Sequence, residues 1–240
     1  MINISLLSNI YDYLCRMKEI YGIVSCDIID STSLDRDALI QLRKDISSSL
    51  FQDINVLCPG FWGRVVRGDT LECCFEKYWM VFRVALMMKC WFMDWASRHS
   101  TAEGMRKEGI RYSIGMGSMR LIDREVDMMD GPAIYLAGRN LDFISNRELT
   151  SYFEMDSGNE EINSLIDNSM MLVDRIVGQS TERQVPILYD RLRGMTEVEI
   201  AQRLSISQGA VNQRAMNAGW PFIKHTLAIL EHIEYGKYVE

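Results

Sequence analysis

Histidine, paired cysteines and long apolar runs are scarce in this 240-residue chain. It has three histidines and no Cys-x-x-Cys pair, so it lacks the usual ligand pattern of a zinc site. No apolar run reaches the roughly 18 residues that a membrane-spanning helix needs, since charged residues interrupt even the most apolar stretch, 78–95. We therefore expect neither a zinc centre nor a membrane partner.

Signals for secretion and for bulk polyanion binding are also missing. Residues 1–18 have no basic start and no small-residue cleavage site, so we expect no signal peptide and a cytoplasmic location. The six cysteines then act as small core hydrophobes in a reducing compartment. The net charge of −7 has the wrong sign for a non-specific polyanion binder, so any nucleic-acid contact is confined to one small face.

Hydrophobic periodicity predicts alternating strands and helices in the first two thirds of the chain. Arg67-Gly68-Asp69 separates two apolar runs and predicts a hairpin, while 104–109 is polar and predicts a loop. The expected strands are 21–29, 61–66, 70–75, 110–121 and 151–155. The expected helices are 1–18, one through Leu39, Leu42, Ile46 and Leu50, 78–98 and 132–145.

This order of elements, β-α-β-β-α-β-α-β, predicts an α+β protein with a ferredoxin-like antiparallel sheet and one extra helix–strand unit. The polar segment 156–163 is the natural linker, and the residues after it are expected to be helical. We therefore predict a first domain over 1–158, including a short N-terminal helix, and an all-helical domain over 159–240.

The helical part contains strong capping signals. Thr196-x-x-Glu199 is a capping box that opens a helix over 197–204. Ser205-Ile206-Ser207 makes a turn, and Ser207 is a good N-cap for a helix over 208–218. An upstream helix over 182–193 contains Pro186, which indicates that this helix starts late or bends.

Residues 196–211, Thr-Glu-Val-Glu-Ile-Ala-Gln-Arg-Leu-Ser-Ile-Ser-Gln-Gly-Ala-Val, resemble a known helix-turn-helix. The similarity is to the tri-helical DNA-binding domain of sigma-factor region four and of LuxR-type response regulators. It covers about forty residues and implies that the second helix enters the major groove of double-stranded DNA. The alternative is a helical hairpin that only packs or contacts another protein.

If the segment binds DNA, amide side chains of the second helix should read base edges. Cations nearby should contact phosphates without specifying sequence. Affinity from one copy would be weak, so a homodimer on paired half-sites is expected. The candidate base-reading residues are Gln208, Asn212, Gln213 and Asn217, and the phosphate contacts are Arg214 and Lys224.

Two carboxylates in the first part of the chain predict a second site. Asp27 ends a strand in Cys26-Asp27-Ile28-Ile29-Asp30-Ser31-Thr32, and Asp69 lies at the hairpin tip. A ferredoxin-like core brings these ends together, so the pair could share a divalent metal while free amides after Asp27 face a phosphate. We expect Ile28, Ile29, Ser31 and Thr32 to contribute to that nucleotide site. Capping of the strand and the hairpin explains the same two carboxylates without a ligand.

The pattern also resembles a class III nucleotidyl cyclase domain. The resemblance implies that Asp27 and Asp69 hold Mg²⁺ or Mn²⁺ and that Arg139 stabilises the transition state. The family's asparagine position, four residues before that arginine, holds Tyr135, and tyrosine does not orient a ribose as an amide does. Surface pairing of Arg139 with Asp142 or Asp130 is the alternative to a phosphate role.

With its trailing helix-turn-helix, the chain as a whole resembles the SatD family over about residues 21–220. This resemblance implies an architecture more than an activity. The sequence therefore predicts a DNA-binding transcriptional regulator with a degenerate, nucleotide-sensing cyclase-like domain. The alternative is an active metal-dependent nucleotidyl cyclase or transferase whose helical tail serves dimerisation or targeting.

Overall fold

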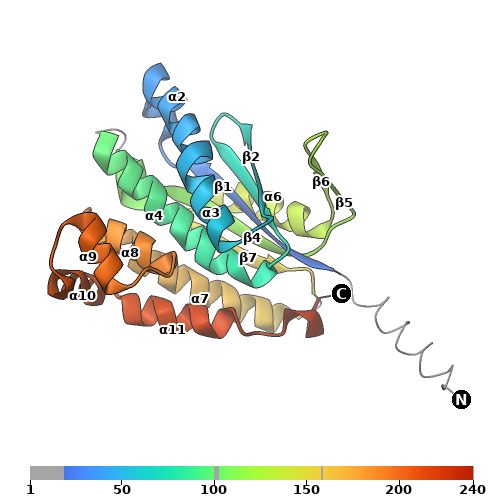
Figure 1. The fold of residues 1–240 in the computed structure, drawn as a ribbon. Helices are drawn as coiled ribbons and strands as arrows, with labels where there is room; N and C mark the ends of the chain where they lie inside the picture. Colours follow the sequence, from blue (N-terminus) through green and yellow to red (C-terminus); the bar gives the residue numbers. More distant parts are fainter. Residues whose placement is uncertain (1–18, 100–102, 158, 240) are drawn as a thin grey trace, which may run out of the picture.

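The computed structural model describes residues 19–99, 103–157 and 159–239 (Figure 1). The helix predicted over 1–18 lies outside these residues. Within them, no helix is both long enough and apolar enough to cross a membrane.

The core of the fold is a five-stranded sheet in the order β2-β3-β1-β4-β7. The first four strands pair antiparallel, and β7 joins β4 in parallel. The first four strands and their helices reproduce the βαββαβ ferredoxin-like arrangement, to which α6 and β7 add one further unit. The predicted α+β class and ferredoxin-like sheet are confirmed. The strands are β1 Ile20–Ile28, β2 Trp62–Arg67, β3 Thr70–Phe75, β4 Ile110–Ser118 and β7 Ser151–Met155.

Strand alternation divides the sheet into two unequal faces. Val24, Cys26 and Ile28 of β1 point into the main core, whereas Ile23 points into a small second core beneath α6. The main core also takes the central helix α4, and five of the cysteines are free and buried in the described residues, as expected of small hydrophobes. The helices of this part are α2 Arg36–Asp45, α3 Phe51–Leu57, α4 Val81–His99 and α6 Pro132–Ser145.

Three predicted elements differ from the structure: the loop 104–109, the strand 110–121 and the helix through Leu39 to Leu50. The expected loop 104–109 is instead helix α5 Glu103–Glu108, in which Lys107 pairs with Glu103 and Met105 is buried. The expected strand 110–121 stops at Ser118, and a separate hairpin follows, made of β5 Leu121–Asp123 and β6 Met128–Asp130. This hairpin extends away from the main sheet (Figure 1).

The helix predicted through Leu39 to Leu50 continues further than the apolar pattern indicated. It passes through one π-helical segment, Ile46–Leu50, and runs on as α3. Leu42, Ile46, Leu50 and Ile54 are all buried in the same core, so the buried positions recur every fourth residue through the π segment.

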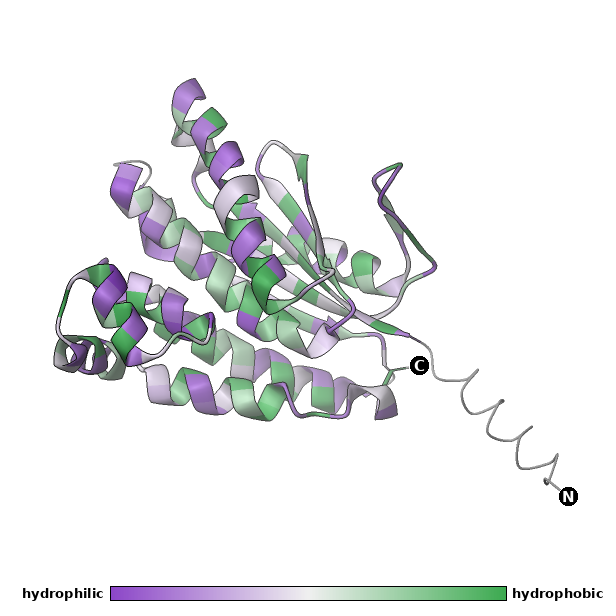
Figure 2. Ribbon diagram, viewed as in Figure 1, coloured by the Kyte–Doolittle hydropathy of each residue, from purple (hydrophilic) through white to green (hydrophobic). Residues whose placement is uncertain are grey.

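The C-terminal helices follow the capping signals closely. Thr196 and Glu199 form the reciprocal capping box at the start of α9, and the Ser207 side chain accepts from the Ala210 N–H at the start of α10. The helix around Pro186 starts late, as its proline indicated. These helices are α7 Glu160–Gly178, α8 Val185–Leu192, α9 Glu197–Leu204, α10 Gln208–Asn217 and α11 Trp220–Leu230. Figure 2 shows hydrophilic and hydrophobic residues alternating along α9 and α11, as expected of helices with one buried face.

One continuous core includes residues from both sides of the segment 156–163. Side chains of α7 and α11 belong to the same buried cluster as β1 and α4. Polar contacts add to this packing: Arg83 of α4 pairs with Glu231 at 2.7 Å, and Asp53 of α3 accepts from Tyr189 of α8 at 2.6 Å. The C-terminal helices are therefore held against the sheet (Figure 1).

A fully buried ion pair lies at this junction. Lys89 Nζ of α4 is 2.8 Å from Asp174 Oδ2 of α7, with exposed side-chain fractions of 0% and 2%. Glu108 of α5 approaches the same ammonium at 3.3 Å, and Thr150 donates to Asp174. Three helices and the residue before β7 thus meet at one buried charge, which penalises any separation of α4 from α7.

We expect Asp174→Ala to lower the free energy of unfolding by about 3–5 kcal/mol, since the Lys89 charge stays buried with a more distant carboxylate. Urea denaturation measures the loss. Lys237→Ala, which breaks an exposed pair with Glu234, is the matched control and should change stability by less than about 1 kcal/mol. Equal small losses in both variants would contradict the assigned role of the buried pair.

Candidate functional site

The two predicted carboxylates lie at the same end of the sheet. Asp27, near the end of β1, is opposite Thr70 in the β1–β3 register, and Asp69 directly precedes Thr70 in the β2–β3 turn. The Ile28 N–H donates to the Asp69 carbonyl at 3.2 Å, which joins the strand end to the hairpin. The structure therefore brings Asp27 and Asp69 together as predicted.

Each carboxylate accepts one hydroxyl from a neighbouring element. Thr70 Oγ1 donates to Asp27 Oδ1 at 2.7 Å, and Ser31 Oγ donates to Asp69 Oδ2 at 2.6 Å. Burial raises the pKa of Asp27, and the nearby Asp69 charge raises it further, while the Thr70 hydrogen bond and Arg111 oppose the rise. The surroundings of Asp27 thus disfavour its ionised form.

Such a pair fits a hard divalent cation. Carboxylate oxygens are ligands of Mg²⁺ and Mn²⁺, and a cation would relieve the repulsion that raises the pKa of Asp27. No group of three or more His, Cys, Asp or Glu side chains suited to a metal occurs in residues 19–99, 103–157 and 159–239. The remaining ligands would have to be backbone carbonyls, water or ligand phosphates.

The prediction of free amides after Asp27 was wrong for two residues. The N–H groups of Ile28 and Ile29 donate to the carbonyls of Asp69 and Gly109, because the chain stays paired with its neighbours beyond the strand. Ser31 and Thr32 lie in the short 3₁₀ turn that follows, after Asp30 in a left-handed conformation at φ 60°. A phosphate would therefore meet the Ser31–Thr32 turn, and Ile28 and Ile29 would contribute no amide.

The predicted residues of α6 have partners within the chain. Arg139 Nη2 lies 3.0 Å from both Glu154 oxygens on β7, so its partner is neither Asp142 nor Asp130. Tyr135 donates to Asp130 of β6 and accepts from Arg120 at 2.6 Å. Arg139 is thus paired with a carboxylate of β7, and no hydrogen bond or ion pair joins it to Asp27 or Asp69 in the described chain.

Several polar residues on the α6 side of the sheet were not singled out by sequence reasoning. Asn140, 5% exposed, donates to Glu154 at 2.7 Å. Ser25 and Ser113 lie opposite each other in the β1–β4 register, and the Oγ atoms of both are buried without a hydrogen-bond partner in the described chain. Ser25 and Ser113 alternate with apolar neighbours along their strands. This alternation was the available signal in the sequence, because it places both serines on the same face of the sheet as Asp27.

The predicted DNA-reading residues lie on the outward side of α10. Gln208, Asn212, Gln213 and Asn217 are exposed, while Val211 and Ala215 of the same helix are buried. Lys224 of α11 is exposed and Arg214 is half-buried. Gln208 donates to Glu197 at 3.2 Å, which fixes the near end of this face.

The support beneath α10 is rigid. Ile187, Ile200, Val211 and Ala215 form one buried cluster between α8, α9 and α10. The buried carboxylate of Asp190 accepts from Arg203 Nε at 2.6 Å, which ties α8 to α9. Helix α10 therefore has a fixed orientation relative to the rest of the chain.

Charge is distributed unevenly in this acidic protein. Residues 200–230 contain no Asp or Glu but include Arg203, Arg214 and Lys224, although the whole chain carries −7. Arg203 is occupied by Asp190, so Arg214 and Lys224 are the cations available beside the exposed amides. Helix α10 itself thus carries no acidic residue, and the Glu197 carboxylate of α9 lies beside its first residue, Gln208.

Comparison with known proteins gives few matches. No protein-family profile and no curated protein matches the chain. Two similar solved structures are both described as a bacterial light-regulated adenylyl cyclase. One has 16% identity and a TM-score of 0.39, covering 56% of this chain and 74% of the other. The second has 12% identity and a TM-score of 0.36, covering 62% and 53%. At this level the likeness says nothing about activity.

We expect Asp27→Asn to increase stability at neutral pH, by at most about 1 kcal/mol because solvent reaches part of this carboxyl. The folded pKa lies above the unfolded one, so the ionised carboxylate destabilises the folded state above both values. The gain should disappear as pH falls below the unfolded pKa, roughly 4. Thermal unfolding between pH 3 and 8 measures it. A variant less stable than the wild type at pH 7 would contradict the assignment.

Proposed function

We propose that this protein is a DNA-binding transcriptional regulator whose α+β part binds a nucleotide with Mg²⁺ or Mn²⁺. The observation that carries the proposal is the face of α10, where amide side chains are exposed on a fixed three-helix support. An amphipathic helix that served only for packing would not require four exposed amides in a stretch without acidic residues.

In this proposal α10 enters the major groove of double-stranded DNA. Asn212, Gln213 and their neighbours on the exposed face hydrogen-bond base edges, for which adenine is the natural partner of an amide. Arg214 and Lys224 contact phosphates and set the register of the helix on the duplex. With so few cations, the affinity should depend only weakly on salt.

A homodimer is the proposed functional unit. One α10 helix with two phosphate-contacting cations buries little surface on DNA, whereas two copies read paired half-sites about one helical turn apart. The α+β part would then act as the sensor, since a nucleotide bound near its sheet can change how two copies meet. A cytoplasmic location follows from this role.

The sensor site is proposed to lie at Asp27 and Asp69. These carboxylates would hold the cation, which neutralises phosphate charge when bound, and the Ser31–Thr32 turn would face the phosphates. Arg139 contacts Glu154 in its own chain, so it would reach a nucleotide at Asp27 only from a second copy. Tyr135, held by Asp130 and Arg120, does not replace an asparagine, which favours sensing over turnover.

Substitutions in α10 test the DNA-binding role. On a duplex selected from a random pool by the wild type, we expect Asn212→Ala to weaken binding by about 1–3 kcal/mol and to relax specificity at one base pair. Arg214→Ala should weaken binding to all sequences and reduce the salt slope by about 1. Fluorescence anisotropy at several salt concentrations measures both effects.

Gln52→Ala is the matched control, because it removes an exposed amide on α3, distant in sequence from α10. It should leave DNA binding unchanged. Selection that yields no enriched duplex, or losses in the control equal to those in α10, would reject the regulator proposal. Asn212 is exposed and the half-buried Arg214 is not part of the core, so nearly unchanged melting temperatures should accompany both α10 substitutions.

A metal-dependent nucleotidyl cyclase or transferase is the second candidate, favoured by the convergence of Asp27 and Asp69. If it is correct, purified protein with Mn²⁺ should consume ATP or GTP, and Asp69→Ala should abolish the reaction. If the regulator is correct, nucleotide binds without turnover, and Asp69→Ala removes Mn²⁺-dependent binding while the isolated variant still folds. Chromatographic product analysis and calorimetry separate these outcomes.

A further inference from the structure

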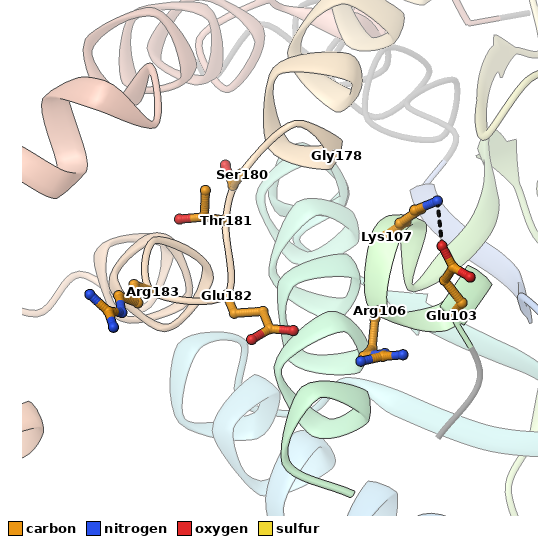
Figure 3. Close-up of a pocket in the computed structure, with 8 residues that line it drawn as sticks. All are labelled: Glu103, Arg106, Lys107, Gly178, Ser180, Thr181, Glu182 and Arg183. Carbon is orange, nitrogen blue, oxygen red and sulfur yellow. Dashed lines mark ion pairs between the residues drawn. The ribbon is translucent and has the colours of Figure 1, made fainter. Parts of the chain in front are cut away.

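A pocket of about 650 Å³ lies between the α+β part and the C-terminal helices, and its lining includes neither Asp27 nor a residue of α10. One wall is α5, which contributes Glu103, Arg106 and Lys107. The other wall is the end of α7 and the loop before α8, from Gly178 to Arg183 (Figure 3). Its volume is in the range of small-molecule sites and exceeds what a single inorganic ion fills.

The pocket has a local excess of positive charge. Three cations and two carboxylates line it, whereas the chain as a whole has a net charge of −7. Lys107 and Glu103 pair at 2.7 Å, so the other charged side chains of the pocket are Arg106, Glu182 and Arg183. Neither arginine has a hydrogen-bond or ion-pair partner among the described residues, and Figure 3 shows them on opposite walls.

Polar groups on the loop add unused hydrogen-bonding capacity. Ser180 Oγ is buried and has no partner in the described chain. Gln184 and Val185 donate their N–H groups to the Thr181 carbonyl, so the chain turns there into α8. The Thr181 N–H donates to Gln184 Oε1 at 2.8 Å, whereas the N–H groups of Glu182 and Arg183 have no backbone partner among the described residues.

The floor of the pocket touches the buried ion pair of the junction. A Cβ placed on Gly178 would lie 2.8 Å from Glu108 Oε2 and 3.5 Å from Lys89 Nζ. The glycine therefore allows the Glu108 carboxylate to pack directly against the end of α7, so the pocket ends beside the charges that join α4, α5 and α7. A ligand here would contact both halves of the chain at once.

We propose that this pocket binds a small phosphate monoester, such as a sugar phosphate or a nucleoside monophosphate, as an effector distinct from the nucleotide proposed at Asp27. Arg106 and Arg183 supply guanidinium groups for charge-assisted hydrogen bonds to the phosphate, which also accepts from the loop hydroxyls and amides. The uncharged part fills the remaining volume above Gly178. Binding stabilises the contact between α5 and the α7–α8 loop.

Calorimetry with ribose 5-phosphate in EDTA tests the proposal, since EDTA keeps a metal-dependent site at Asp27 empty. We expect wild-type protein to bind it and not to bind ribose, and Arg106→Gln/Arg183→Gln to weaken binding at least about tenfold. Arg36→Gln/Lys44→Gln removes the same charge from exposed positions of α2 and should leave the affinity within about twofold. Hydrogen exchange should slow in 103–108 and 178–184, but not in 27–32.

Absence of ribose 5-phosphate binding, or equal weakening in both double variants, would overturn the proposal. Equal affinity for inorganic phosphate would show an adventitious ion only and would overturn it as well. Protection confined to 27–32 would assign the ligand to the Asp27 region instead. None of these results bears on DNA binding or on Mn²⁺-dependent nucleotide binding, so the two proposals succeed or fail separately.

Discussion

The burial of α4 on both sides is the constraint on which the rest of the structure depends. Its side chains pack against the sheet on one side and against the C-terminal helices on the other, and fourteen of its residues are buried. Exposing one side of so apolar a helix would cost much free energy, because each large side chain contributes about 1.5–3 kcal/mol on burial. The C-terminal helices are therefore part of the core that stabilises the sheet.

The charged residues at the junction give this packing a defined geometry. Apolar contacts alone would tolerate small rotations of α7 and α8 over α4, because the hydrophobic effect is not directional. The Lys89–Asp174 pair allows no such freedom, since moving either residue leaves a charge without a partner in the interior. Arg83 with Glu231, and Asp53 with Tyr189, fix the orientation at two further points.

Local signals in the sequence predicted most of the elements. The strand alternation of β1, the hairpin around Gly68 and the capping box at Thr196 each depend on a few neighbouring residues, so they could be read directly. Helix α5 was missed because its stability comes from burying Met105 and from one ion pair, which composition does not reveal. The shared core was missed for a similar reason, since the polar segment 156–163 gave no sign that α7 returns to the sheet.

In the candidate site too, some features could be predicted from the sequence and others depend on contacts between distant residues. The meeting of Asp27 and Asp69 followed from topology, because a ferredoxin-like order places a strand end beside the hairpin. The partners of those residues did not follow, since the pairing of Arg139 with Glu154 depends on where β7 joins the sheet. The loss of the Ile28 and Ile29 amides likewise depends on contacts with residues far along the chain.

The rigid junction restricts how a signal could reach α10. In a chain whose two parts were joined by a flexible linker, a ligand could release the DNA-reading helix from a hindering surface. Here α8 supports α10 and is itself fixed to α3 and α4, so the helix cannot swing without breaking buried contacts. The exposed face is also unobstructed already. Under the proposed function, a ligand would therefore have to change the distance or angle between two copies, because half-site spacing on DNA is sensitive to both. The α+β part, with its projecting β5–β6 hairpin, offers a surface on which that geometry could be set.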